Sequence, residues 1–348
     1  MSARVTLALD AMGGDKAPEM VIRGAEIALE RLPDLRFLIF GREDEVAALI
    51  PKDSPLSKAA EIRHAPDVVG ADVKPSVALR NSRDTSMRQA IEAVRDGVAS
   101  GMVSAGNTGA LMAMSKVVLR TVPGIDRPAI ASFFPTRRGE SVMLDLGANI
   151  ECDAANLVQF AIMGDVFARA VLGMPKPTIG LLNVGAEDQK GHENIRSAAA
   201  ILRATTLPLD FRGFIEGDDI GAGTVDVIVT DGFTGNVALK TAEGMAKLIT
   251  TFLRECFKSS FMARVGYVLS RTALKRLSLR IDPRRYNGAM FLGLNGIVVK
   301  SHGGTDEFGF ANAIGVAADL CRQGFIDRIR DEIGNLAQEL NEKKAAAI

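Results

Sequence analysis

The chain has 348 residues, 42 basic and 42 acidic side chains and therefore no formal net charge, and 47% of its residues are hydrophobic. This balance is typical of a soluble globular protein and argues against a surface coated in positive charge for nucleic acid, while an aromatic content of 5% argues against base stacking. Three scattered cysteines and three histidines provide neither a disulfide framework nor a local metal-binding motif, which suits a reducing cytoplasm.

The apolar stretches of the chain are too short or too polar to predict a targeting signal or a membrane span. The first apolar run, after Arg4, ends at Asp10 and is too short for the core of a signal peptide. The uncharged stretch 97–115 is rich in glycine and serine and would be a poor membrane span. We therefore expect a cytoplasmic protein, built as a single α/β domain over residues 1–348 with one or two lobes.

Short aliphatic and β-branched runs alternate with amphipathic stretches, which predicts an α/β fold with a mainly parallel sheet. The expected strands are 5–9, 36–40, 101–104, 130–134, 142–146, 178–184, 225–229 and 296–300. The first helix should begin after Pro18 and place Val21, Ala25, Ala28 and Leu32 on one face.

A final helix is expected over residues 325–343, with aliphatic side chains at alternating spacings of three and four residues. These are Ile326, Ile329, Ile333, Leu336 and Leu340. Core packing is the ordinary explanation of such a pattern, and a dimer seam is the alternative.

One segment departs from the charge balance of the rest. Between Arg254 and Arg285, nine basic side chains and two acidic ones give a net charge of +7, which leaves −7 for the remainder. Interleaved apolar residues predict a basic amphipathic helical hairpin over residues 241–285. Its candidate docking residues are Arg254, Lys258, Phe261, Arg264, Val265, Leu269, Arg271, Lys275 and Arg276. An anionic membrane surface, an acidic protein and simple solvation of the hairpin are all open explanations.

Six polar, glycine-rich loops follow predicted strands, at residues 10–15, 104–110, 145–149, 183–191, 231–236 and 300–306. Because the carboxyl ends of parallel strands meet at one sheet edge, we expect these loops to converge there. The candidate substrate-binding residues are Asp10, Gly13, Gly14, Ser104, Gly106, Asn107, Thr108, Gly109, Asn149, Asn183, Asp231 and Thr234. The loop at 104–110 precedes an apolar helix, whose N-terminus favours an anion.

The candidate catalytic residues in these loops are Lys190, Lys300 and His302, as charge or proton partners, and Asn236, as a neutral donor. The sequence contains no GxGxxG, GxxxxGK[ST] or GxSxG motif, and no cysteine lies in a polar, glycine-rich loop. The loops therefore suit an enzyme that positions an anion and stabilises developing charge, without a covalent acyl-enzyme.

Six segments in this order resemble the motifs of the PlsX family, bacterial phosphate acyltransferases. They are DAMGGD at 10–15, SAGNTGA at 104–110, LDLGAN at 144–149, LNVGAEDQKG at 182–191, DGFTGN at 231–236 and VVKSHGG at 298–304. The resemblance extends from about Val5 to Gln323. It implies a three-layer sandwich like that of isocitrate and isopropylmalate dehydrogenases, with a helical excursion, usually a homodimer, and no metal or nicotinamide cofactor.

The reaction implied by the resemblance is attack of inorganic phosphate on the thioester of a long-chain acyl-acyl carrier protein. The acyl phosphate would feed a membrane-bound glycerol-3-phosphate acyltransferase in phospholipid synthesis, with the enzyme peripherally bound to the inner face of the cell membrane. We expect Lys190 to hold phosphate or developing charge and Asn236 to orient the carbonyl or phosphate, with weaker cases for Lys300 and His302.

Three other functions are compatible with parts of the sequence. A phosphotransacetylase-like enzyme would use coenzyme A thioesters, and a decarboxylating dehydrogenase would need a metal-binding aspartate cluster and a nicotinamide site that the sequence does not display. A non-catalytic membrane-surface scaffold would use the basic hairpin but leave the six loops unexplained.

Overall fold

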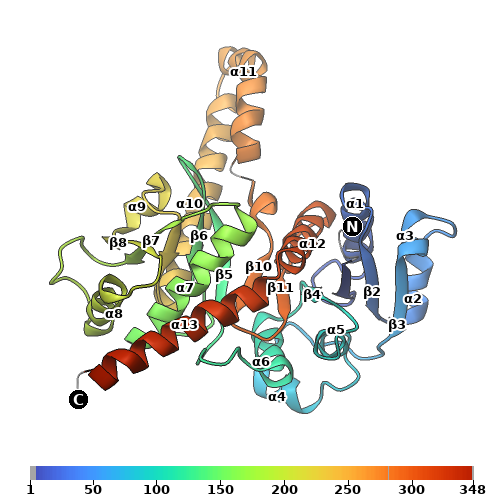
Figure 1. The fold of residues 1–348 in the computed structure, drawn as a ribbon. Helices are drawn as coiled ribbons and strands as arrows, with labels where there is room; N and C mark the ends of the chain where they lie inside the picture. Colours follow the sequence, from blue (N-terminus) through green and yellow to red (C-terminus); the bar gives the residue numbers. More distant parts are fainter. Residues whose placement is uncertain (1–4, 281, 347–348) are drawn as a thin grey trace.

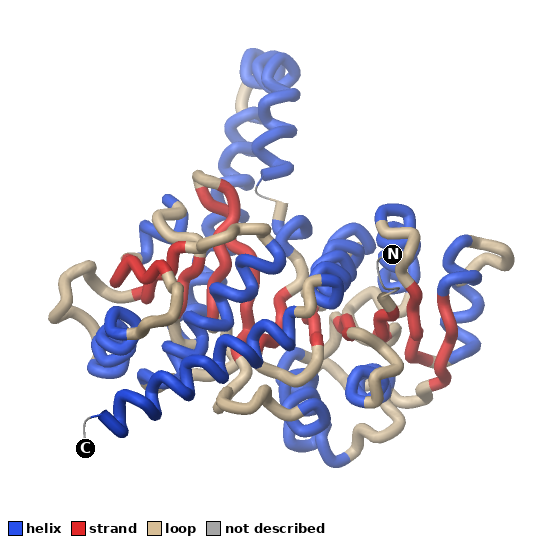
Figure 2. Tube along the Cα trace, viewed as in Figure 1, coloured by secondary structure: helices blue, strands red, loops and turns tan. Residues whose placement is uncertain are grey.

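The computed structural model describes residues 5–280 and 282–346, and these residues form one sheet of eleven strands (Figures 1 and 2). In chain order the strands are β1 (Thr6–Asp10), β2 (Arg36–Gly41), β3 (Ala60–His64), β4 (Gly101–Ser104), β5 (Ala129–Thr136), β6 (Gly139–Leu144), β7 (Thr178–Leu182), β8 (Asp210–Ile215), β9 (Val227–Val229), β10 (Ala289–Leu292) and β11 (Ile297–Lys300). All eight predicted strands are confirmed, with ends shifted by a few residues. β3, β8 and β10 were not predicted.

The direction of the strands changes in the middle of the sheet. The order is β3-β2-β1-β4-β11-β10-β5-β6-β9-β7-β8, and neighbours are parallel except in the pairs β11–β10, β10–β5 and β5–β6. Three reversals make β6, β9 and β7 run opposite to β1, β4 and β11. The prediction that all six loops share one sheet edge is therefore wrong: three leave one edge and three leave the other.

Each strand divides its side chains between two helical layers because successive residues point to opposite faces. In β1, Leu7 and Leu9 belong to one core and Ala8 to the other, and β6 divides Val142 and Leu144 from Met143 in the same way. One layer contains α1 (Glu19–Arg31), α2 (Glu43–Leu49), α3 (Pro55–Ala59), α7 (Ala154–Val171), α8 (Glu193–Ala204), α12 (Glu307–Arg322) and α13 (Phe325–Ala346). The other contains α4 (Pro75–Arg80), α5 (Ser86–Arg95), α6 (Thr108–Leu119), α9 (Gly217–Ala222) and the first turns of α10 (Gly232–Lys258). The result is a three-layer α/β sandwich.

Two helices of the first layer, α7 and α13, are candidates for a membrane span and for a dimer contact, respectively. α7 is long and apolar enough to cross a membrane, but 78% of it is buried inside the protein, so it is a core helix. α13 buries Phe325, Ile329 and Ile333 in the same core, as core packing predicts. The side chains of Leu336 and Leu340 lie outside the described residues, and the dimer seam stays a prediction.

A helical hairpin projects from the body of the protein (Figure 1). It consists of α10 and α11 (Phe261–Arg280), and α10 begins at Gly232, nine residues before the predicted start of the hairpin. At 1.5 Å per residue, α10 is about 40 Å long and carries the tip well beyond the sheet. Among its exposed apolar side chains, Phe261 is 77% and Leu269 is 81% exposed.

Candidate active site

The loops after β6, β9 and β7 are neighbours because these three strands are adjacent in the sheet. The first turn of α10 lies directly on the loop after β6. A Cβ atom on Gly232 would be 2.6 Å from the backbone oxygen of Asn149, and one on Gly235 would be 1.9 Å from that of Asp145. The two glycines of DGFTGN therefore permit a close backbone approach that a side chain would prevent.

Asp145 organises the loop after β6. Its buried carboxylate accepts hydrogen bonds from the backbone N–H groups of Ile130, Gly147, Ala148 and Asn149 at 2.7–3.2 Å. Burial raises the pKa of this carboxyl group. The side-chain amide of Asn149 donates to Asp145 and to the backbone oxygen of Pro128. Asn149, predicted to bind substrate, is therefore engaged in holding its own loop.

Asn236 differs from the polar residues just before it. Asp231 caps α10 by accepting from the backbone N–H of Thr234 at 2.8 Å and from its hydroxyl at 3.0 Å, so both predicted substrate ligands are engaged in the cap. Asn236 is exposed, and its side chain lies against Gly147, where a Cβ would be 3.7 Å away. Among the described residues it has no side-chain hydrogen bond, so its amide is available to a ligand.

Lys190 is presented by the loop after β7. Its backbone oxygen accepts from Nδ2 of Asn183 at 3.2 Å, and the next carbonyl, of Gly191, accepts from Arg196 at 2.7 Å. The exposed Nζ of Lys190 makes no hydrogen bond or ion pair within the described part of the chain. The Oδ1 atom of Asn183 is buried without a hydrogen-bond partner. The loop backbone is thus fixed while the ammonium group can meet an anion.

Exposed apolar side chains occur on the same segments as these two polar residues. Val184 and Ile150 lie in the loops after β7 and β6, Phe233 and Val237 lie in the first turns of α10, and all four are 50–78% exposed. Cys152 lies nearby, but burial raises the pKa of its thiol to about 12, which keeps the thiolate unpopulated near neutral pH. This cluster can position an anion beside an apolar group, and its cysteine is unsuited to be a nucleophile.

A second cluster lies at the opposite edge, after β1, β4 and β11. The buried carboxylate of Asp10 accepts from the hydroxyls of Ser86 and Ser104, each at 2.6 Å. A Cβ on Gly13 would be 2.5 Å from this carboxylate, and the backbone N–H of Asp15 donates to the oxygen of Gly303 at 2.9 Å. The predicted ligands Gly13, Gly14, Ser104 and Gly106 thus pack these loops together.

Lys300 and His302 also belong to this second cluster, so the structure does not bring them to Lys190 and Asn236. Lys300 is 9% exposed, and its Nζ donates to the backbone oxygens of Ser301 and of Ala105. Burial lowers the pKa of Lys300 to about 8, opposed by the charge of Asp10. His302 is exposed, and its Nδ1 accepts from the N–H of Gly304. Within the described residues, no hydrogen bond or ion pair joins the two clusters.

The N-terminus of α6, the helix after β4, keeps only part of its predicted capacity to bind an anion. Asn107 caps α6 through its Oδ1 and donates from Nδ2 to the oxygens of Ala71 and Val73, so its side chain is not an available donor. Thr108 and Gly109 are exposed and occupy the first turn, where backbone N–H groups lack intrahelical acceptors. The anion-binding potential of this loop therefore rests on its backbone.

Sequence reasoning missed two residues that shape the second cluster. Ser86 comes from the start of α5, and Asn287 donates to Ser301 Oγ at 2.8 Å while accepting from the N–H of His302. Neither follows a predicted strand, so no local signal marked them. Within the described ranges, no group of three or more His, Cys, Asp or Glu side chains is placed to hold a metal ion.

Comparisons with known proteins agree on the class of enzyme. The profile of a family described as "Fatty acid synthesis protein" matches residues 5–328. A phosphate acyltransferase of Rhodospirillum centenum is 64% identical over 348 residues, which is 100% of this chain and 97% of the relative. One from Rhodospirillum rubrum is 60% identical over 336 residues, covering 97% of this chain and 96% of the relative.

Solved structures share the fold at low sequence identity. A phosphotransacetylase from Streptococcus pyogenes has a TM-score of 0.62 at 19% identity, covering 92% of this chain and 95% of that one. The EutD phosphotransacetylase from Staphylococcus aureus has a TM-score of 0.60 at 16% identity, with the same coverage. They support the α/β fold with a mostly parallel sheet, while the narrower dehydrogenase-like assignment stays a prediction.

Proposed function

The chain belongs to the PlsX family of phosphate acyltransferases, described as fatty acid synthesis proteins, and from that premise we propose that it transfers a long-chain acyl group from acyl-acyl carrier protein to inorganic phosphate. The observation that carries the proposed site is that a lysine and an asparagine, both without side-chain bonds to the described residues, lie on segments that follow two adjacent strands. Lys190 follows β7 and Asn236 follows β9, and β7 and β9 are adjacent.

The chemistry requires little more than placement and charge stabilisation. A phosphate oxygen attacks the thioester carbonyl carbon, the carbon–sulfur bond breaks, and the carrier leaves as a thiolate that takes up the phosphate proton. The amide of Asn236 stabilises the oxyanion that forms at the carbonyl, and the ammonium of Lys190 offsets the negative charge of phosphate and of the departing sulfur. The exposed Val184, Phe233 and Val237 provide apolar surface for the acyl or pantetheine chain.

The donor is tested by single-turnover reactions with phosphate, using palmitoyl-acyl carrier protein or palmitoyl-coenzyme A and measuring acyl phosphate directly. We expect acyl phosphate from the carrier-protein donor, at a rate at least tenfold above that from coenzyme A. Equal rates, or preference for coenzyme A, would favour the phosphotransacetylase-like alternative, whose fold this chain shares. A folded enzyme that forms no acyl phosphate from either donor would contradict the proposed reaction.

We further propose that the hairpin attaches the enzyme reversibly to the anionic inner face of the cell membrane. The predicted docking residues on α10 and α11 are all exposed. Bulky apolar side chains accompany them in the first half of α11, where the predicted Phe261 and Leu269 and the neighbouring Met262 and Val268 are 67–81% exposed. Basic side chains near a membrane surface contribute about 1 kcal/mol each at low salt. Apolar insertion and electrostatic attraction therefore act together.

The double variant Phe261→Ser/Leu269→Ser is expected to reduce binding to vesicles of phosphatidylglycerol and phosphatidylcholine by at least tenfold. Insertion of the two apolar side chains into the membrane contributes about 3 kcal/mol or more to the binding free energy, and the variant loses this contribution. Flotation at low and high salt measures this binding. Val117→Ser, on the body of the protein and 58% exposed, is the matched control. Equal vesicle binding by the double variant and the control would refute docking through these apolar side chains of α11.

A further inference from the structure

A groove of about 590 Å³ lies at the root of the hairpin, and none of the residues assigned to the two loop clusters lines it. Its lining residues come from the last turns of α11, the short 3-10 helix η1 (Pro283–Tyr286), α1, α12 and the first residues of β6. Three guanidinium groups line it, from Arg31 on α1, Arg276 on α11 and Arg285 on η1. These come from three separate segments that the fold brings together.

Within the part of the chain that the structure describes, the three arginines form no ion pair with a carboxylate, although the charge of Arg285 helps to lower the pKa of Asp282. Arg276 and Arg285 have no side-chain hydrogen bond or ion pair with the described residues. Arg31 donates to Oδ1 of Asn312 at 2.8 Å, and its guanidinium lies 4.9 Å from the ring centre of Phe308, which orients it without neutralising it. Glu140 is the one carboxylate among the described lining residues, and it forms no ion pair. The lining side chains therefore carry a net charge of +2.

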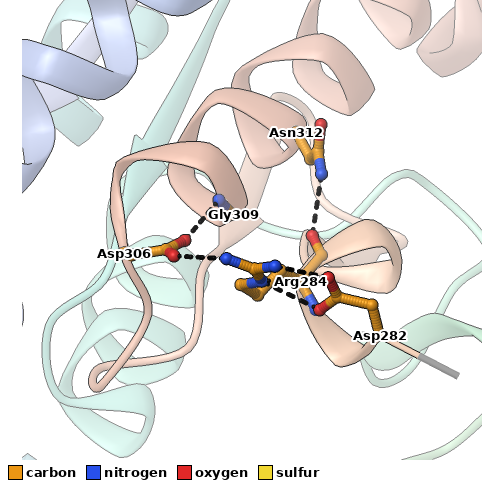
Figure 3. A network of polar contacts seen from close by, with 5 residues as sticks. All are labelled: Asp282, Arg284, Asp306, Gly309 and Asn312. Atoms are coloured by element: carbon orange, nitrogen blue, oxygen red, sulfur yellow. Dashed lines mark hydrogen bonds and ion pairs between the residues drawn. The ribbon is translucent and has the colours of Figure 1, made fainter. Parts of the chain in front are cut away.

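The adjacent Arg284 shows the opposite arrangement (Figure 3). Its guanidinium forms ion pairs with Asp282 at 2.6 Å and Asp306 at 2.8 Å. Its backbone oxygen accepts from Nδ2 of Asn312 at 2.8 Å. Two carboxylates bind Arg284 and tie η1 to α12, so the turn is fixed while the next residue, Arg285, lines the groove without an ion pair to any described residue.

We infer that this groove binds a phosphate monoester. Such a group carries a charge of about −2 at neutral pH and three acceptor oxygens, which matches the net charge and the planar donors of the groove. A second groove of about 200 Å³ shares Arg31, Arg285 and Asn312 and continues between α1 and α12 over Ala28 and Ala311. Its lining also includes Asp319, whose carboxylate lies 3.8 Å from the guanidinium of Arg322. This second groove gives room for the organic part of the ester, whether a free sugar or polyol phosphate or a phosphatidate headgroup.

Isothermal titration tests the site with two probes, sn-glycerol 3-phosphate and phosphatidylcholine vesicles that contain phosphatidate. The measurement is made in a Lys190→Ala background, so that it does not depend on the proposed reaction. Arg285→Gln is expected to weaken binding by about tenfold or more, because charge-assisted hydrogen bonds to phosphate are lost. Arg31→Gln/Arg285→Gln should abolish it. Arg83→Gln, which removes the same charge from an exposed position, is the matched control.

The two probes identify the source of the phosphate. Binding of glycerol 3-phosphate that Arg285→Gln weakens indicates a soluble ester, and binding of phosphatidate vesicles alone that Arg285→Gln weakens indicates a lipid headgroup. Arg285 makes no side-chain bond with the described residues, so Arg285→Gln tests the site even if the double variant is unstable. The inference is overturned if neither probe binds, or if Arg83→Gln weakens binding as much as Arg285→Gln does.

Discussion

The variant Asn236→Ala is expected to lose about 100- to 1,000-fold in kcat for acyl phosphate formation, the usual cost of removing one oxyanion donor. Because the stabilised charge exists only in the transition state, KM for the acyl donor should change little. Asn236 is exposed and has no side-chain hydrogen bond with the described residues, so the free energy of unfolding should stay within about 0.5 kcal/mol of wild type. Steady-state kinetics and urea denaturation measure the two quantities.

Two further variants separate charge from shape at the same site. Asn236→Asp keeps the size of the side chain but replaces the amide donor by a carboxylate, so it should be at least as impaired as Asn236→Ala. Lys190→Ala should lower kcat and raise KM for phosphate, since the ammonium contacts phosphate before and during reaction. Lys176→Ala, an exposed lysine just before β7, is the control for loss of charge. Near-normal turnover by Asn236→Ala and Lys190→Ala together would remove both residues from the mechanism.

Local sequence pattern predicted the core strands because they are short aliphatic runs followed by turn residues. It missed β3 and β8, which are the two outermost strands of the sheet. Both are only partly apolar, as in Ala-Glu-Ile-Arg-His of β3. It also missed β10, four residues long. The pattern of apolar and polar side chains indicates where a strand lies and which of its faces is buried. It does not indicate whether the neighbouring strand runs parallel or antiparallel.

The direction of the strands decided how the predicted site residues are grouped. β10 and the β5–β6 hairpin insert three antiparallel contacts, and this places Lys300 and His302 at the opposite edge from Lys190 and Asn236. Residue type was also ambiguous. Asn107 and Asp231 are the kinds of residue that bind anions or substrates, and the same kinds of residue cap helices, which is what they do here.

The variant Asp10→Ala is expected to lower the free energy of unfolding by about 3–5 kcal/mol at pH 7, measured by urea denaturation. Asp10 is fully buried and accepts hydrogen bonds from the hydroxyls of Ser86 and Ser104, which come from two different segments. Its removal leaves two buried hydroxyls without their acceptor and takes from buried Lys300 the stronger of the two carboxylate charges that raise its pKa. Asp72→Ala, at an exposed position, should change stability by less than about 0.5 kcal/mol.

The pH dependence of the stability lost in Asp10→Ala shows how much of that loss is due to the interaction of Asp10 with charged Lys300. Burial lowers the pKa of Lys300 to about 8 in the native protein, and without Asp10 that pKa should fall further. At a pH below the pKa of Lys300 in both wild type and Asp10→Ala, Lys300 is charged in both proteins, so the variant shows its full loss of stability. As the pH rises to 8, Lys300 loses its proton first in the variant. The difference in the free energy of unfolding then shrinks to the part due to the lost hydrogen bonds. Asp10→Asn keeps the shape and one of the two acceptor oxygens, so its penalty should contain the whole charge-dependent part and a smaller part from lost hydrogen bonds than that of Asp10→Ala. A penalty for Asp10→Ala below about 1 kcal/mol, or one independent of pH between 6 and 9, would show that the electrostatic contact between Asp10 and Lys300 does not hold the loops after β1, β4 and β11 together.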